Sequence, residues 1–339
     1  MRTSKTSQTK SLPIETLRGI AIILVVIGHV IGSRSTGGMQ VDDDSFYRYL
    51  YCLLENIRMP LFTVISGWVY GLHPVKKEEF KIFITKKARR LLLPMIFVGS
   101  TYFIIQYLIP GTNHKEELHA IWNIYIYPYT FFWYLPALFL VFISISFLDI
   151  SNKINTVIQW LIALLISYLL CIIEISHIIP ASVPNLFAFK NALYLMPFFI
   201  LGVGLNRFKE KLYTKPMIRF YLIGTIIGVI LQQTDYFIGV NFYNQLHLSI
   251  LIGIISTAFI LHSNIKIPFF IWLAKYAYTI YLFHGFGTSG GRIILKSMHV
   301  HNEFIIFLFA TIIAILSSIV IEKILIKVKL TRILFLGKK

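Results

Sequence analysis

Residues 17–29 read LRGIAIILVVIGH, an apolar run that contains two ionisable side chains, Arg18 and His29. The apolar character extends on both sides to cover residues 14–32, and a helix needs about 20 such residues to cross a bilayer. Ionisable groups inside a membrane are costly and usually serve a function. The stretch therefore predicts a membrane helix with two functional side chains.

The rest of the chain repeats this pattern. Of 339 residues, 56% are hydrophobic and 14% charged, where soluble chains have about 25% charged residues. The apolar runs are continuous, whereas strands of a membrane barrel alternate apolar and polar residues. We predict an all-α, polytopic integral membrane protein whose single domain fills residues 1–339. Its transmembrane helices, about ten, lie near 14–32, 47–72, 91–109, 131–148, 157–175, 190–206, 217–233, 247–262, 268–285 and 303–326.

The positive charges are unevenly distributed among the connecting segments. The chain has a net charge of +17, and with the N-terminus inside, cytoplasmic segments hold 23 of the 32 Lys and Arg residues. Since cytoplasmic loops of membrane proteins are rich in Lys and Arg, we predict that both termini are cytoplasmic and that the protein is a multi-pass component of the cell membrane. The basic loops fit contact with anionic membrane lipid better than binding of nucleic acid.

The first span aligns its two ionisable side chains. Arg18 and His29 are eleven residues apart, close to three helical turns, so both face one side, ~16 Å apart along the axis. Arg18 lies near the cytoplasmic surface, and His29 lies more than halfway across. Each residue also has a purely structural interpretation. Arg18 could be an arginine that extends its charge to the membrane surface, and His29 could form a hydrogen bond between packed helices. The shared face favours a common function.

Six stretches in order carry a family resemblance. The first is the arginine, ten residues and histidine of 18–29, and the others are NIRMPLFTVISGW (56–68), KKARRLLLP (86–94), FFWYLPALF (131–139), AYTIYLFH (277–284) and IEK (321–323). Together they resemble membrane acyltransferase family 3, which includes O-antigen, peptidoglycan and fucose O-acetylases. The family more often has aspartate where this chain has Glu15. The resemblance implies transfer of an acyl group from cytoplasmic acyl-CoA, usually acetyl-CoA, to a sugar hydroxyl of a cell-surface or lipid-linked glycan.

This resemblance assigns a role to the cytoplasmic cations. CoA phosphates need positive partners, which we expect to be Arg18, Lys86, Lys87, Arg89, Arg90 and Lys275. The pantetheine arm would then run along the first span and bring the thioester near His29. Histidine has a pKa suited to removing the hydroxyl proton, so we expect His29 to be the general base. A covalent acyl-histidine intermediate is the alternative.

Other polar groups in or near the spans are weaker candidates. Arg58 lies one turn from Glu55. One interpretation is an intramembrane ion pair between these two side chains. The alternative is that Arg58 stabilises the oxyanion or holds the acceptor. Glu174 and His284 are candidates for acceptor binding. Neither the histidines nor the two cysteines have the spacing of a metal site, and we predict no metal.

Two other classes of function remain open at this stage. Cations that face a cavity inside the membrane also suit a transporter or flippase for an anionic glycan precursor. Such transporters usually have paired halves with broken helices in matching positions, which this sequence does not display. A purely structural partner in an envelope complex leaves Arg18 and His29 unexplained. The sequence therefore favours the acyltransferase.

Overall fold

A computed structural model describes residues 11–113, 115–239 and 247–339. Within these ranges the regular secondary structure is entirely helical, without a strand, which confirms the all-α prediction. The long helices are α1 (Leu12–Ile31), α2 (Phe46–Gly71), α3 (Phe80–Leu108), α5 (Tyr134–Ile150), α6 (Val157–Ile175), α7 (Phe189–Arg207), α9 (Lys215–Ile238), α11 (Leu248–His262), α13 (Ala277–Ser297) and α14 (Glu303–Leu325).

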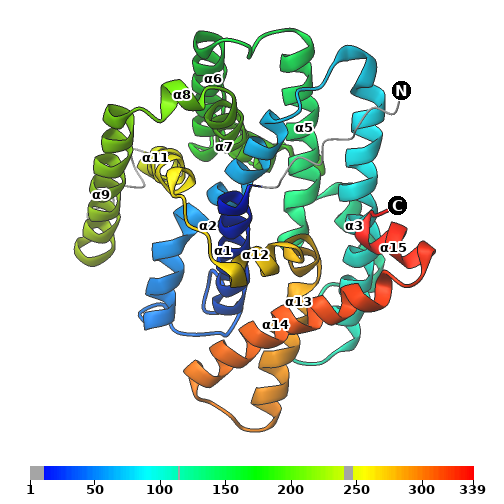
Figure 1. Ribbon diagram of the computed structural model, residues 1–339. Coiled ribbons are helices and arrows are strands. Elements are labelled where there is room, and N and C mark those ends of the chain that lie inside the picture. The colour runs from blue at the N-terminus through cyan, green and yellow to red at the C-terminus, as the bar shows by residue number, and fades with distance from the viewer. Residues whose placement is uncertain (1–10, 114, 240–246) are drawn as a thin grey trace.

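Short helices connect or extend the long ones. They are α4 (Asn123–Ile126), α8 (Lys209–Leu212), α12 (Pro268–Ala274) and α15 (Lys329–Leu336), with the 3-10 turns η1 (Lys77–Glu79), η2 (Leu118–Trp122), η3 (Thr130–Trp133) and η4 (Leu186–Ala188). Figure 1 shows α1 near the middle of the bundle, with α9 at one edge and α15 at the opposite edge.

Seven helical segments in the described ranges are long and apolar enough to cross a membrane. They are Leu12–Ile31, Lys77–Leu108, Leu118–Ile150, Val157–Ile175, Leu186–Arg207, Lys215–Ile238 and Glu303–Leu325. Most of α1 is buried inside the protein, whereas α6 and α9 leave most of their apolar side chains uncovered. Since uncovered apolar helix faces need a lipid solvent, the chain is a multi-pass membrane protein.

Three predicted spans are not both long and apolar enough to be counted among these seven segments. α11 is apolar but has only 15 residues. α2 has 26 residues and includes Arg48, Glu55 and Arg58, which lower its hydropathy. The predicted span at 268–285 corresponds to α12 and the first part of α13, which are separate helices. Seven segments meet the criteria of length and apolar character, so the number of ten transmembrane helices stays a prediction.

The helix at 285–291 extends beyond its predicted end. The sequence predicted a span that ends at residue 285, but the glycine-rich residues that follow lie inside α13, which continues to Ser297. Here Gly287 and Gly291 face α14: a Cβ atom on them would lie 2.4 Å and 2.9 Å from the Cα atoms of Ala314 and Ala310. Small residues let membrane helices approach this closely. The glycines therefore serve helix packing.

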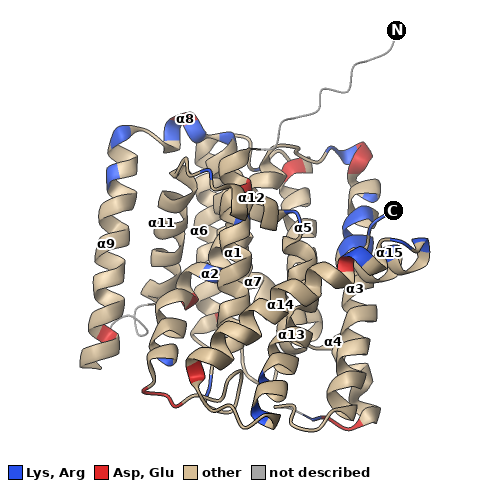
Figure 2. Ribbon diagram, turned by 60° about the horizontal axis from the view of Figure 1, so that its bottom comes forward, with Lys and Arg blue, Asp and Glu red and all other residues tan. Residues whose placement is uncertain are grey.

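Buried polar contacts join the helices near one end of the bundle. Arg207 of α7 binds Asp149 of α5 through two hydrogen bonds of 2.6 and 2.9 Å, and the hydroxyl of Tyr70 in α2 donates to the same carboxylate. Figure 2 shows that Lys and Arg gather at this end, which also contains α8, α15 and the start of α3. We call it the basic end.

Candidate active site

Helix α1 determines the separation of Arg18 and His29. It runs without a break from Leu12, where Pro13 occupies the first turn, to Ile31, and Gly32 ends it with φ +84°. The eleven-residue separation therefore corresponds to ~16 Å along the axis. Arg18 lies in the second turn of α1, and His29 lies in the last turn.

A cavity of about 310 Å³ opens beside Arg18, and we call it the basic cavity. Three further cations line it, Lys87 and Arg90 of α3 and Lys275 after α12. Phe62, Tyr134 and Tyr281 are among its aromatic lining residues. Four predicted donor-binding cations from three segments thus face one space.

The cations of the basic cavity are held in different ways. Arg18 donates to Glu15 at 2.7 Å. The Lys87 amine lies 3.6 Å from the ring centroid of Phe142, and the Arg90 guanidinium lies 5.3 Å from that of Tyr278. Within the described ranges, neither Lys87, Arg90 nor Lys275 has a carboxylate within 4 Å. Their charge is available for an anion.

The other two predicted donor-binding cations do not line this cavity. Lys86 is exposed on α3. Arg89 is partly buried, and its backbone carbonyl lies beneath Gly337, just after α15. Residues 87 and 90 share one face of α3 because they are three apart, and Lys86 and Arg89 share another.

Toward the other end of α1, His29 meets His284 of α13. The two ring centroids are 4.9 Å apart, and the Phe131 ring lies 5.7 Å from His29 and 4.4 Å from His284. His284 is fully buried, whereas His29 retains an exposed surface. We call these two residues the histidine pair.

The hydrogen bonds of His284 define its tautomer. Its Nδ1 lies 3.0 Å from the Ile280 carbonyl and 2.7 Å from the Tyr281 carbonyl. Since carbonyls only accept, Nδ1 must carry the proton and donate it. In neutral His284 the Nε2 atom is then an acceptor, and it is buried without a hydrogen-bond partner among the described residues. A buried acceptor without a partner is uncommon, and it leaves Nε2 able to accept a hydrogen bond from a group that binds beside it.

Arg58 of α2 lies against α1 beside His29. A Cβ atom on Gly28 would lie only 1.9 Å from Nη1 of Arg58, so only glycine leaves room for the guanidinium there. The ring of Tyr51 lies 4.0 Å from the guanidinium carbon. The suggested ion pair with Glu55 is wrong, because the two side chains, both in the described part of the chain, lie beyond 4 Å.

A model of the acyltransferase domain family matches residues 13–323. The chain belongs to membrane acyltransferase family 3. The match covers α1 from its second residue, all residues that line the basic cavity, and the histidine pair. The six stretches of sequence that suggested this family all lie within or at the edge of the matched region.

One curated relative extends this result. The chain is 27% identical over 200 residues to the nodulation protein NolL of Mesorhizobium japonicum, a match that covers 58% of this chain. The chain spans about half the length of that protein, 48%. No solved structure matches the chain.

Glu174, predicted to bind the acceptor, lies near the end of α6. Among the described residues, it forms no hydrogen bond or ion pair with Arg58 or the histidine pair. His284, the other predicted acceptor-binding residue, lies directly beside His29.

Sequence reasoning missed the aromatic residues between the basic cavity and the histidine pair. Tyr281 lines the cavity, its ring lies 6.1 Å from that of His284, and its hydroxyl donates to the Phe131 carbonyl. Both Tyr281 and Phe131 fall in the family-like stretches 277–284 and 131–139. The stretches were therefore a signal for them, although the contact joins segments about 150 residues apart.

Proposed function

We propose that this protein is an O-acyltransferase that moves an acyl group, acetyl in the simplest case, from cytoplasmic acyl-CoA to a sugar hydroxyl of a cell-surface glycan or its precursor. The observation that carries the proposal is the arrangement along α1. A cation-lined cavity lies near its first turns, and a histidine with an exposed surface lies in its last turn. A donor with an anionic end and a distant reactive end needs such an arrangement.

The donor would enter from the basic end. Its phosphates would bind Arg18, Lys87, Arg90 and Lys275, because charge-assisted hydrogen bonds to phosphate are strong in a partly buried site. The slim pantetheine arm would pass Tyr281 and bring the thioester to the histidine pair. The contact of Tyr281 with His284 supports this route, since the cavity and the pair are adjacent there.

The transfer would be a direct attack of the acceptor on the thioester. His29 takes the proton of the sugar hydroxyl as its oxygen attacks the carbonyl carbon. Arg58 stabilises the oxyanion. When the C–S bond breaks, the imidazolium of His29 returns the proton to the CoA sulfur. The neutral His284 accepts a hydrogen bond at Nε2 and orients the reacting groups. The acyl-histidine route remains the alternative.

The orientation is part of the same proposal. We place the basic end in the cytoplasm and both termini there, because Lys and Arg mark cytoplasmic segments. In a cell membrane with this orientation, α2, α11 and the pair α12–α13 would complete ten crossings. The histidine pair would then lie toward the outer face, where a glycan acceptor arrives.

The direct test compares cell-surface glycans from strains with and without this gene. We expect base-labile O-acyl groups to be lost on deletion and restored by the wild-type gene but not by a His29→Gln gene. A glycan that reaches the surface in normal amount without its acyl groups supports the enzyme. Loss of the glycan itself, with no change in acylation of what remains, would favour the transporter.

A further inference from the structure

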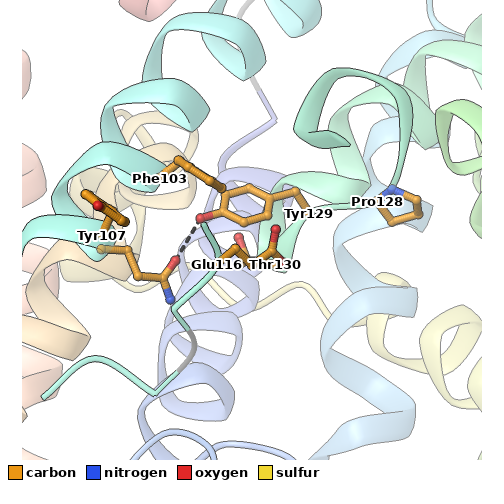
Figure 3. A pocket seen from close by; sticks show the side chains of 7 residues that line it. Phe103, Tyr107, Glu116, Pro128, Tyr129 and Thr130 are labelled. Atoms are coloured by element: carbon orange, nitrogen blue, oxygen red, sulfur yellow. Dashed lines mark hydrogen bonds between the residues drawn. The ribbon is translucent and has the colours of Figure 1, made fainter. Parts of the chain in front are cut away.

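A second cavity lies at the end of α3 opposite the basic end, and we call it the Tyr129 pocket. Its volume is about 360 Å³, within the ~300–1,000 Å³ range of ligand sites. Figure 3 shows its side chains, which come from the last turns of α3 and from the segments on either side of η2 and α4. The lining includes Phe103, Gln106, Tyr107, Glu116, Tyr129 and Thr130.

The lining combines aromatic rings with free polar groups. The Tyr129 hydroxyl donates to Gln106 Oε1 at 2.7 Å, which fixes the tyrosine ring (Figure 3). Among the described residues, the Gln106 amino group has no acceptor, so it can donate to a ligand. The Glu116 side chain is exposed, and among the described residues it has neither a hydrogen bond nor an ion pair. A pyranose ring offers C–H faces to aromatic rings and hydroxyls to carboxylate and amide groups.

A smaller cavity of about 280 Å³ adjoins the Tyr129 pocket. Both cavities are lined by Glu116, Pro128 and Tyr129, and the smaller one adds Asn123 and Tyr127. Glu116 and Tyr129 therefore border two neighbouring spaces. This arrangement fits two consecutive sugar units better than a single monosaccharide.

The pocket is continuous in the chain with the histidine pair. Tyr129 and Thr130 line the pocket, and the next residue, Phe131, contacts both His29 and His284. Thr130 has φ +41°, a left-handed conformation that is strained for a threonine. Such strain persists where the surrounding structure requires it, often at functional sites. Here it turns the chain from the pocket toward the histidine pair.

We propose that the Tyr129 pocket is the acceptor subsite: it binds an oligosaccharide of at least two pyranose units and presents one hydroxyl to His29. This inference rests on the proposed function. Glu116 and Gln106 bind sugar hydroxyls, and the rings of Tyr129 and Tyr107 stack on the C–H faces. Phe131, which contacts both histidine rings, borders the position where the hydroxyl would meet His29.

The test measures steady-state acyl transfer to fragments of the producing strain's own surface glycan after alkaline removal of its acyl groups. Glu116→Gln should raise the acceptor KM about tenfold or more, because a charge-assisted hydrogen bond is lost, and should leave the acetyl-CoA KM unchanged. Tyr129→Phe keeps the ring but not the hydroxyl and should have a smaller effect than Tyr129→Ala. The matched control is Glu117→Gln, since Glu117 is equally exposed, pairs with His119 and does not line the pocket.

Binding of the same fragments to the purified protein, measured by calorimetry, separates this inference from the proposed function. Disaccharide and longer fragments should bind wild type and bind Glu116→Gln more weakly, whereas monosaccharides should bind poorly. If wild type transfers acetyl groups while Glu116→Gln and Tyr129→Ala keep the wild-type acceptor KM, the pocket is not the acceptor subsite and the enzyme stands. If wild type binds the fragments through Glu116 but transfers nothing, the subsite stands and the enzyme fails.

Discussion

At the scale of single residues, the absence of a side chain at position 28 is as important as any side chain present. Arg58 occupies the space where a Cβ atom of residue 28 would lie, one position before His29. In the proposed mechanism, the guanidinium is thereby held beside the general base, where charge develops when the thioester carbonyl is attacked. Polar groups preorganised in this way usually provide the largest part of transition-state stabilisation.

Gly28→Ala tests this arrangement. The new methyl group displaces only the end of a flexible arginine, so the protein should fold and bind acetyl-CoA normally. We expect acetyl transfer to fall about 10²-fold, the effect of removing one oxyanion donor. Gly290→Ala is the control, because a Cβ atom there meets no atom within 4 Å. Equal activity of the two variants would remove Arg58 from the mechanism.

The cations of α3 allow a second comparison at this scale. Arg90 lines the basic cavity, whereas Lys86, one turn earlier, does not. Arg90→Gln should weaken acetyl-CoA binding by more than about tenfold, since a hydrogen bond to a charged group contributes about 1.5–3 kcal/mol. Lys86→Gln removes the same charge from the same helix and should leave the dissociation constant unchanged. Equal weakening by both would reduce the cations to a general electrostatic effect.

The sequence predicted part of this site and left part undetermined. Arg18 and His29 lie on one helix, so the helical period alone relates them. Lys87 and Arg90 could not be separated from Lys86 and Arg89, because the choice depends on which face of α3 meets α5 and α13. His284 is 255 positions from His29, and only the tertiary structure brings these two rings together.

At the scale of elements, α13 shows how one sequence signal has two meanings. Glycines usually mark loops, but Gly287 and Gly291 are four residues apart and match Ala310 and Ala314 on α14. Interfaces between membrane helices favour this spacing of small residues. The helix therefore continues beyond the predicted end of the span at residue 285 and includes Arg292 and Lys296.

Gly287→Ala should destabilise the contact between α13 and α14. The added Cβ atom would lie 2.4 Å from a backbone atom of Ala314, which cannot move as a side-chain end can. Overpacking of this kind costs about 1–3 kcal/mol. We expect a lower Tm for the purified protein in detergent, with Gly290→Ala again as the matched control. An unchanged Tm would show that the two helices separate easily.

At the scale of the whole molecule, the composition was sufficient to predict a helical membrane protein but not the number of its membrane crossings. A hydrophobic fraction of 56% requires lipid around the helices, and the all-helical structure follows because helices satisfy their own backbone there. The number of crossings depends on α2, α11 and α13, which are less apolar or shorter. Arg58 of α2 lies beside His29, and His284 of α13 contacts it, so hydropathy undercounts helices that position the candidate site.

The orientation gives a prediction for the complete protein. Cys52 and Cys171 are free, so both can be replaced by alanine before single cysteines are introduced at Asp43 and Lys339. A membrane-impermeant thiol reagent added to intact cells should label Asp43→Cys and not Lys339→Cys. Disruption of the membrane should make both reactive. The reverse pattern in intact cells would place the basic cavity outside, away from acyl-CoA.

The central claim is that His29 is the general base for transfer of an acyl group from a donor bound at the basic end. His29→Gln and His29→Asn each keep a hydrogen-bonding amide near the position of a ring nitrogen, but neither takes up a proton near neutral pH. Both variants should therefore fold and bind acetyl-CoA. Only the step that needs a base should be affected.

The most direct measurement adds radiolabelled acetyl-CoA to inside-out membrane vesicles and counts base-labile label on the glycan. Wild type should transfer label, whereas the two His29 variants should bind the donor equally well and transfer it ~10²–10⁴-fold more slowly, the usual contribution of a general base. Near-normal transfer by either variant, or no transfer by wild type in vesicles that bind acetyl-CoA, would contradict the account.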